Sequence, residues 1–201
     1  MANFNISIDI SKHRNVNRQI LGNNIEWINS CNNLYVNKSF NQNILKYLKE
    51  IPSNNLRYPG NELADAYVWC NGVGDDVERR PNRSNVSNSD TQEINFGTDE
   101  FLELCKELKS IPIFGVNIFS DTPQSAADWV DYVNKKINKC GSCLVEHEPV
   151  NEIIPHGMYW ELGYTPYLDA KFGFPNMTAS QYANLAVQFV NEMKEVDPSL
   201  K

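Results

Sequence analysis

The chain has 201 residues, of which 41% are hydrophobic and 21% charged, with a formal net charge of -7 and a sequence pI near 5.0. This size and apolar content suffice for one packed domain and exclude global disorder. The acidic balance argues against nucleic acid or an anionic membrane as the partner, because both require clustered lysine and arginine. No apolar run approaches the roughly 20 residues of a membrane helix, and no signal-peptide pattern opens the sequence. A cytoplasmic protein is expected, or an extracellular one if the N-terminus is incomplete.

The first predicted elements are two strands and a helix. Residues 1–15 predict a half-buried strand, because Phe4, Ile6, Ile8 and Ile10 alternate with polar residues. Residues 20–27 predict a second strand that leads into a polar loop. A helix follows, indicated by the spacing of Ile44, Leu45 and Leu48. This pair is the first βα unit.

A second unit starts with a short strand at residues 54–58, which the following Pro-Gly stops. Residues 61–95 are long, polar and rich in turn formers, as is typical of a functional or disordered loop. We expect Thr98 to be the N-cap of the next helix. Its buried stripe is predicted to contain Phe101, Leu104, Cys105 and Leu108.

Two further units complete the pattern. Residues 111–119 are almost continuously apolar, which predicts a parallel strand buried on both faces, and Thr122-Pro123 begins a helix after it. Residues 158–162 predict a fourth strand. Thr178 and Gln181 then form a capping box for the last helix.

Four successive βα units predict a parallel α/β architecture, and four units are half of an eight-stranded (β/α)8 barrel. A half-barrel has two open sheet edges. We therefore expect a fragment that is marginally stable, a homo-oligomer, or a chain that pairs with a complementing barrel half.

The cysteines favour a reducing compartment. Five is an odd number, and Cys31, Cys70 and Cys105 lie in apolar or mixed sequence typical of buried free thiols. Cys140 and Cys143 form a lone C-x-x-C, which predicts loop cysteines or a local disulfide rather than a zinc site. The polar loop with Glu146, Glu148, Glu152, His147 and His156 has no metal-ligand spacing. No metal and no cofactor are predicted.

Several segments, in this order and spacing, resemble glycoside hydrolase family 51, the α-L-arabinofuranosidases of the (β/α)8 retaining glycosidases. The resemblance covers nearly the whole chain. It implies that residues 1–15 belong to an accessory β-sandwich and residues 16–201 to a partial barrel. The segments are Leu21 to Trp27, Leu56 to Asn61, Tyr67 to Trp69, Gly72 to Gly74, Glu78 to Pro81, Asn95 to Cys105, Gly115 to Asn117 and Tyr159 to Tyr167.

The resemblance also implies a sugar-binding pocket at the carboxyl ends of the strands. Glu26, Asn61 and Asn117 would hydrogen-bond sugar hydroxyls, Arg57 would lie near the base of the pocket, and Trp69 would offer an apolar platform. The alternative for Arg57 and Asn117 is a satisfied buried polar network. Trp69 taken alone fits packing better than a platform.

The chemistry of this family requires two carboxylates about 5–5.5 Å apart. The chain departs from the family motif here, because Tyr164 and Thr165 stand where an Asn-Glu pair is expected. Thr165 cannot replace the acid/base, and Tyr164 removes the asparagine expected at the 2-hydroxyl. The family nucleophile lies on a later strand. Glu161 is better explained as the partner of a basic residue in the barrel than as a substitute acid.

Three interpretations remain open. The first is an arabinofuranosidase-type hydrolase of arabinose-containing plant glycans, catalytically incomplete as given. The second is a non-catalytic carbohydrate-binding relative. The third is a structural module that uses its sheet edges to pair with another chain.

Overall fold

The computed structural model describes residues 20–51, 53–75, 77–85, 88–139, 158–167 and 176–201, with residues 6, 7, 9, 11, 15 and 17 before them. The loop from Cys140 to His156, and Phe4, Ile8 and Ile10 of the predicted N-terminal strand, lie outside the described residues. Ile6 of that strand is 87% exposed. No helix in the described part of the chain is long and apolar enough to cross a membrane.

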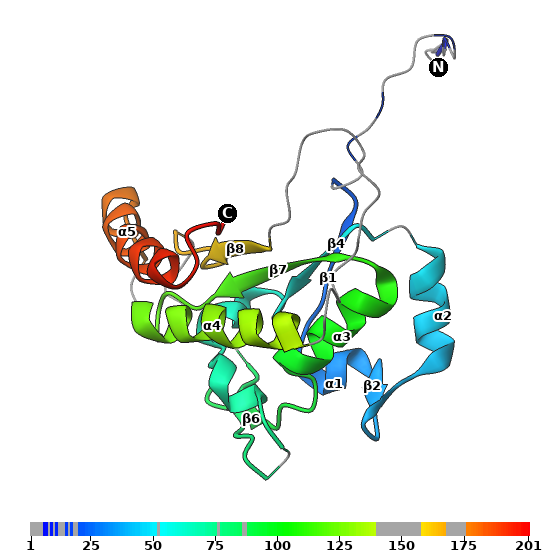
Figure 1. Ribbon diagram of the computed structural model, residues 1–201, viewed down its shortest axis with the longest axis horizontal. Helices are drawn as coiled ribbons and strands as arrows, with labels where there is room; N and C mark the ends of the chain where they lie inside the picture. Colours follow the sequence, from blue (N-terminus) through cyan, green and yellow to red (C-terminus); the bar gives the residue numbers. More distant parts are fainter. Residues whose placement is uncertain are drawn as a thin grey trace, which may run out of the picture.

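A parallel four-stranded sheet organises the described residues, in the order β1-β4-β7-β8 (Figure 1). The strands are β1 (Gly22–Asn24), β4 (Asn55–Tyr58), β7 (Ile111–Val116) and β8 (Tyr159–Leu162). Sequence-adjacent units are neighbours in the sheet, as predicted for consecutive βα units. β1 is shorter than the predicted strand at residues 20–27; the Ile25 N–H still donates to the Arg57 carbonyl of β4 at 2.7 Å, and the chain then turns into α1.

The helices are α1 (Ile28–Asn32), α2 (Gln42–Glu50), α3 (Thr98–Leu108), α4 (Pro123–Lys139) and α5 (Ala179–Val196). α3 and α4 lie against one face of the sheet, and α5 packs beside α4 (Figure 1). α1 is a left-handed turn rather than an α-helix, since φ is positive from Asn29 to Asn32. A small hairpin of β2 (Tyr35–Val36) and β3 (Ser39–Phe40) follows; Asn37 and Lys38 at its tip have the positive φ of a type I′ turn.

The helix starts bear out one predicted cap and correct another. Thr178 and Gln181 form the predicted capping box of α5. At α3 the N-cap is Gly97 and not Thr98, and the Glu100 carboxylate accepts the Gly97 N–H at 2.7 Å. Thr98 is instead buried in the first turn, where its hydroxyl accepts a hydrogen bond from Trp129 Nε1 at 3.1 Å.

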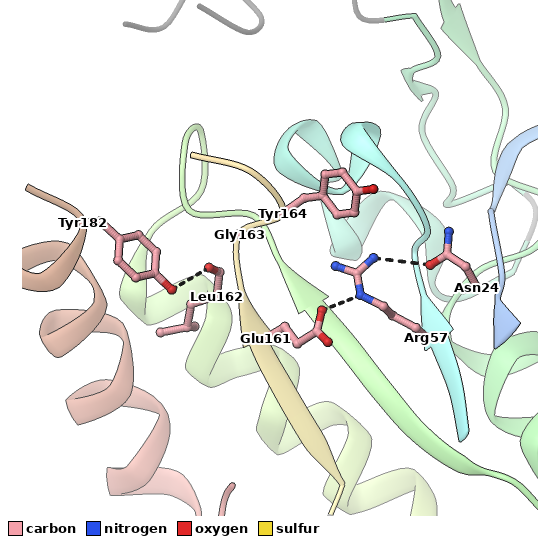
Figure 2. Close-up of a pocket in the computed structure, with 7 residues that line it drawn as sticks. All are labelled: Asn24, Arg57, Glu161, Leu162, Gly163, Tyr164 and Tyr182. Atoms are coloured by element: carbon pink, nitrogen blue, oxygen red, sulfur yellow. Dashed lines mark hydrogen bonds and ion pairs between the residues drawn. The ribbon is translucent and has the colours of Figure 1, made fainter. Parts of the chain in front are cut away.

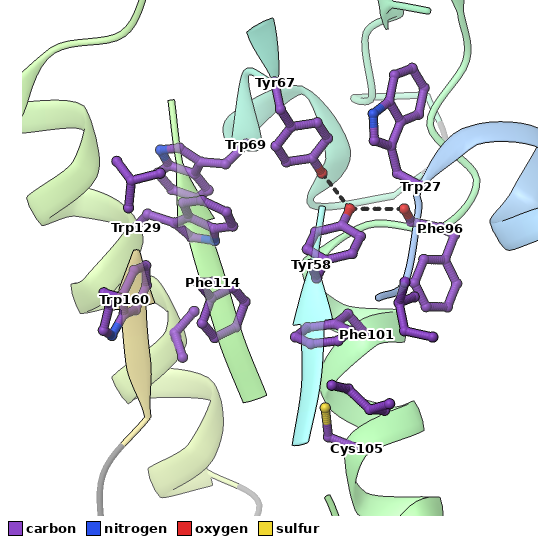
Figure 3. Packing of buried hydrophobic residues seen from close by; sticks show 14 of the residues in the cluster. Trp27, Tyr58, Tyr67, Trp69, Phe96, Phe101, Cys105, Phe114, Trp129 and Trp160 are labelled. Carbon is purple, nitrogen blue, oxygen red and sulfur yellow. Dashed lines mark hydrogen bonds between the residues drawn. The ribbon is translucent and has the colours of Figure 1, made fainter. Parts of the chain in front are cut away.

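The long segment 61–95 contains short ordered pieces rather than a featureless loop: η2 (Glu62–Ala66), η3 (Trp69–Gly72), β5 (Asn82–Arg83) and β6 (Thr91–Gln92). It is anchored to the core through Tyr67. The hydroxyls of Tyr58 and Tyr67 are 2.6 Å apart, and the Tyr58 hydroxyl donates to the Phe96 carbonyl at 3.0 Å (Figure 3). Burial raises the pKa of both phenols, so each stays protonated and keeps this link.

The side chains of the sheet alternate between a closed and a more open face. Leu56, Tyr58 and Phe114 are fully buried toward the helices. Phe114 lies next to Trp160, with ring centroids 4.7 Å apart (Figure 3). Ile111 and Ile113 are only half-buried, which corrects the prediction that this strand is buried on both faces. Arg57 and Glu161 belong to the more open face, because side chains alternate along a strand. Arg57 lies between the buried Leu56 and Tyr58, and Glu161 follows the buried Trp160. This face positions the site.

Candidate functional site

A cleft of about 660 Å³ opens at the carboxyl ends of the parallel strands (Figure 2). It is lined by Asn24, Arg57, Glu161, Leu162, Gly163, Tyr164 and Tyr182. Because parallel strands present their carboxyl ends at one edge, residues from three separate strands meet here.

Arg57 lies at the centre of the cleft and is held from three sides. Its Nε donates to Glu161, and its Nη1 donates to the Gly60 carbonyl and, at 3.3 Å, to Asn24 Oδ1 (Figure 2). Arg57 of β4 reaches Glu161 of β8 across the intervening strand β7. A Cβ at Gly115 of β7 would lie 3.7 Å from Arg57 Nη2. The prediction that Glu161 pairs with a basic residue of the barrel is therefore confirmed.

The turn after β8 is fixed by two neighbouring elements. Gly163 has φ +74°, and its N–H donates to the Val116 carbonyl at 2.9 Å. Asp65 of η2, which is fully buried, accepts the N–H of Tyr164 at 2.9 Å and that of Thr165 at 3.5 Å. Both carboxyl oxygens of Asp65 accept a backbone N–H, so Asp65 holds this turn against η2.

The walls of the cleft are two tyrosines. The Arg57 guanidinium lies 5.0 Å from the centroid of the Tyr164 ring, and Tyr164 is 39% exposed. On the other side, the Tyr182 hydroxyl of α5 donates to the Leu162 carbonyl at 3.0 Å (Figure 2). The cleft therefore joins an ion pair and two aromatic rings.

Glu26 and Asn61 lie together beside the cleft without lining it. Asn61 Nδ2 donates to Glu26 Oε1 at 2.7 Å, and Asn61 Oδ1 accepts the Leu63 N–H at 3.0 Å. Gly60 connects this pair to Arg57: a Cβ there would lie 2.8 Å from Glu26 Cγ, and its carbonyl accepts from Arg57. Three of the sequence-predicted residues, Glu26, Arg57 and Asn61, thus form one group.

Asn117 and Trp69 lie in the interior instead. Asn117 is 2% exposed, donates to Ser120 Oγ at 2.7 Å and accepts the N–H groups of the next turn, which corresponds to the alternative of a satisfied polar network. Trp69 is 8% exposed, stacks on Trp129 with ring centroids 6.0 Å apart, and donates to the Ser125 carbonyl. In this conformation its ring is not a platform for a sugar.

The described cysteines are free, and two of the three are buried. Burial, followed by the negative charge of Glu26, raises the pKa of Cys31 to about 12. Burial also raises the pKa of Cys105. Cys70 is exposed, which corrects its predicted burial; it lies on η3, whose other face carries Trp69 into the core.

Among the described residues, the carboxyl groups at or beside the cleft each have a partner. Glu161 is paired with Arg57, Glu26 accepts from Asn61, and Asp65 is buried under the turn, while Thr165 carries only a hydroxyl. Among the described residues, no group of three or more His, Cys, Asp and Glu side chains is placed to hold a metal ion.

Sequence reasoning missed three residues of this site. Asn24 and Tyr182 contribute to the lining, and Asp65 holds the turn. The available signal for Asn24 was its place in the family segment Leu21 to Trp27. Asp65 carried none, since it lies in a polar loop between two alanines. Tyr182 is spaced with the apolar residues of its helix, a pattern typical of core packing.

Known proteins share the sequence and the fold of this chain. The Alpha-L-arabinofuranosidase 1 domain family matches residues 47–201. A probable alpha-L-arabinofuranosidase C of Aspergillus niger is 34% identical over 170 residues, covering 84% of this chain and 33% of that protein. The intracellular exo-alpha-(1->5)-L-arabinofuranosidase 1 of Bacillus subtilis is 30% identical over 163 residues, covering 81% and 32%. The alpha-L-arabinofuranosidase of Thermotoga maritima, solved with arabinose, superimposes with a TM-score of 0.70 at 27% identity, covering 92% and 39%.

The fold is therefore part of a (β/α)8 barrel of the glycoside hydrolase class. The chain belongs to the Alpha-L-arabinofuranosidase 1 domain family, within glycoside hydrolase family 51. It spans about a third of the length of the curated relatives it matches.

Proposed function

We propose that this chain binds α-L-arabinofuranosyl groups of glycans in the cleft around Arg57, and that the chain as given does not hydrolyse them. The observation that carries the proposal is the turn after β8, where Thr165 occupies the position at which the family motif has its acid/base glutamate. Glu161, the acidic residue that lines the described cleft, is paired with Arg57. Thr165 and Glu161 therefore do not form the pair of carboxylates that retaining hydrolysis requires.

The proposal assigns the group Glu26, Arg57 and Asn61 to the sugar hydroxyls. Their support is position: Arg57 lies near the carboxyl end of β4, Glu26 and Asn61 follow β1 and β4, and Asn61 Nδ2 donates to Glu26 Oε1 at 2.7 Å. The relative from Bacillus subtilis is named intracellular, and the proposal extends that compartment to this protein. Residues 1–15 are proposed as a strand of an accessory sheet.

The test combines turnover and binding on the purified chain. We expect no release of nitrophenol from p-nitrophenyl α-L-arabinofuranoside, and saturable binding of methyl α-L-arabinofuranoside by NMR titration. Arg57→Ala is expected to abolish that binding, whereas Lys49→Ala, on an exposed pair of α2 and α3, leaves it unchanged. Turnover by the unmodified chain would refute the inactive assignment, and no binding would refute the site.

A second candidate is an interaction module, favoured by the sheet order, in which β1 and β8 are the outer strands of the described sheet. The β8 edge is already partly used, because the Trp160 N–H donates to the Lys201 carbonyl at 3.1 Å. Analytical ultracentrifugation separates the two candidates: a module that pairs through its edges gives a concentration-dependent dimer, and a monomer at all concentrations excludes self-pairing.

A further inference from the structure

We propose that Tyr164 is the specificity-determining residue of the cleft, and that its ring is a fixed platform for the apolar C–H face of a neutral sugar. The inference rests on the proposed function and adds to it how the sugar is recognised. In this proposal Tyr164, and not Trp69, makes the apolar contact with the sugar, because the Trp69 ring is stacked on Trp129 inside the core.

The backbone of Tyr164 is held in place before any ligand arrives. Its N–H donates to the fully buried Asp65 at 2.9 Å, and the preceding Gly163 is bonded to the Val116 carbonyl at 2.9 Å. A Cβ at Gly163 would lie 2.8 Å from Ile118 Cδ1, so β7 and its following turn pack tightly against this segment. The base of the side chain is therefore fixed from two elements.

The ring itself is held by Arg57. The guanidinium carbon lies 5.0 Å from the ring centroid, which is within the range of a cation–π contact. Arg57 is in turn tied to Glu161, Gly60 and Asn24 (Figure 2). Tyr164 remains 39% exposed and lines the cleft, so part of this side chain is accessible to a ligand there. A ring that is already ordered loses little conformational entropy when a ligand stacks on it.

Polar groups for hydroxyls lie next to this platform. Asn24 Oδ1 accepts from Arg57, which leaves its Nδ2 as a donor at the cleft. Glu161 uses Oε2 for Arg57, and its side chain is 43% exposed, which leaves Oε1 as an acceptor. A flat apolar surface beside one donor and one acceptor matches a sugar ring, which has a C–H face and hydroxyls at its rim.

The experiment measures binding of methyl α-L-arabinofuranoside to the full 201-residue chain and to variants at one position. Tyr164→Phe keeps the ring and should bind within about twofold of the unmodified chain. Tyr164→Ala removes the ring and should weaken binding about tenfold, or about 1.4 kcal/mol. Saturation-transfer NMR with irradiation of aromatic protons should show transfer to the sugar C–H protons, and Tyr164→Ala should remove it.

Tyr167→Ala is the matched control, because Tyr167 is on the same segment, is 68% exposed and does not line the cleft. It should leave both affinity and saturation transfer unchanged, and equal melting temperatures across the set establish intact folding. Equal losses in Tyr164→Phe and Tyr164→Ala would overturn the inference, since the hydroxyl and not the ring would then bind. Unchanged binding in Tyr164→Ala would overturn it while the proposed function stands. No binding by the unmodified chain would overturn both.

Discussion

The buried ion pair between Arg79 and Glu100 gives the sharpest test of how the long segment 61–95 is held. The Arg79 Nη2 to Glu100 Oε1 distance is 2.7 Å, and the two side chains are only 8% and 11% exposed. Arg79 also donates to the Ile94 carbonyl at 3.1 Å and to the Gly74 carbonyl at 3.2 Å. One guanidinium thus joins both parts of the segment to the first turn of α3.

Arg79→Met should destabilise the chain by about 3–5 kcal/mol, because it leaves the Glu100 carboxylate buried without its countercharge. With a urea dependence of about 2 kcal/mol/M, the unfolding midpoint should fall by about 2 M. Arg79→Lys keeps the charge and should lose less. Glu100→Gln in the Arg79→Met background should recover part of the loss, since the amide oxygen can still accept the Gly97 N–H.

Lys49→Met is the matched control. Lys49 and Glu107 form a pair of similar length, 2.8 Å, but their side chains are 48% and 43% exposed, so the expected cost is at most about 1 kcal/mol. Urea unfolding followed by near-ultraviolet circular dichroism measures all of these variants. The reasoning fails if Arg79→Met costs no more than Lys49→Met, or if the double-mutant cycle gives no coupling between Arg79 and Glu100.

Other predictions concern glycines and thiols. Gly97→Ala would place a Cβ 1.9 Å from the Gly72 carbonyl oxygen and should lower the melting temperature by at least about 5 °C. Gly115→Ala is the control, because the nearest atom to its Cβ would be 3.6 Å away, and it should be tolerated. Thermal unfolding of both variants makes the comparison. At pH 8 in the native chain, iodoacetamide should label the exposed Cys70 before the buried Cys31, as read by mass spectrometry; faster labelling of Cys31 would contradict its burial. The folded chain favours the protonated Cys31 thiol, so this contribution to stability is present below pH 9 and is lost as pH rises toward 12. Cys31→Ala should therefore reduce the fall of the unfolding free energy with pH above pH 9. An unchanged pH dependence of the unfolding free energy would disprove this.

The sequence was sufficient for the order of elements because each βα unit has its own local signal. The capping box at Thr178, the stripe of α3 and the strand before Pro59 depend on neighbours within a few residues. Local patterns were insufficient where a distant group decides the outcome. Thr98 fits the N-cap pattern, yet its hydroxyl is taken by Trp129, 31 residues away, and Gly97 becomes the cap.

The candidate site divides in the same way. Resemblance to the family motifs named Glu26, Arg57 and Asn61, which the structure places in one group. It also named Asn117, whose side chain instead turns back and bonds its own loop. The role of Asp65 could not be predicted for a different reason. It depends on backbone N–H groups 99 and 100 residues away, and such contacts leave no pattern in a single sequence.

The pairing of Arg57 with Glu161 also bears on how ligands approach. The two charges cancel at the centre of the cleft, while the chain as a whole carries a net charge of -7. An uncharged ligand has no net charge on which the field of the protein can act, so its association rate should change little with salt. A polyanion is expected to be repelled at low salt by the net negative charge of the chain, so the charge of this protein disfavours acidic ligands relative to neutral ones.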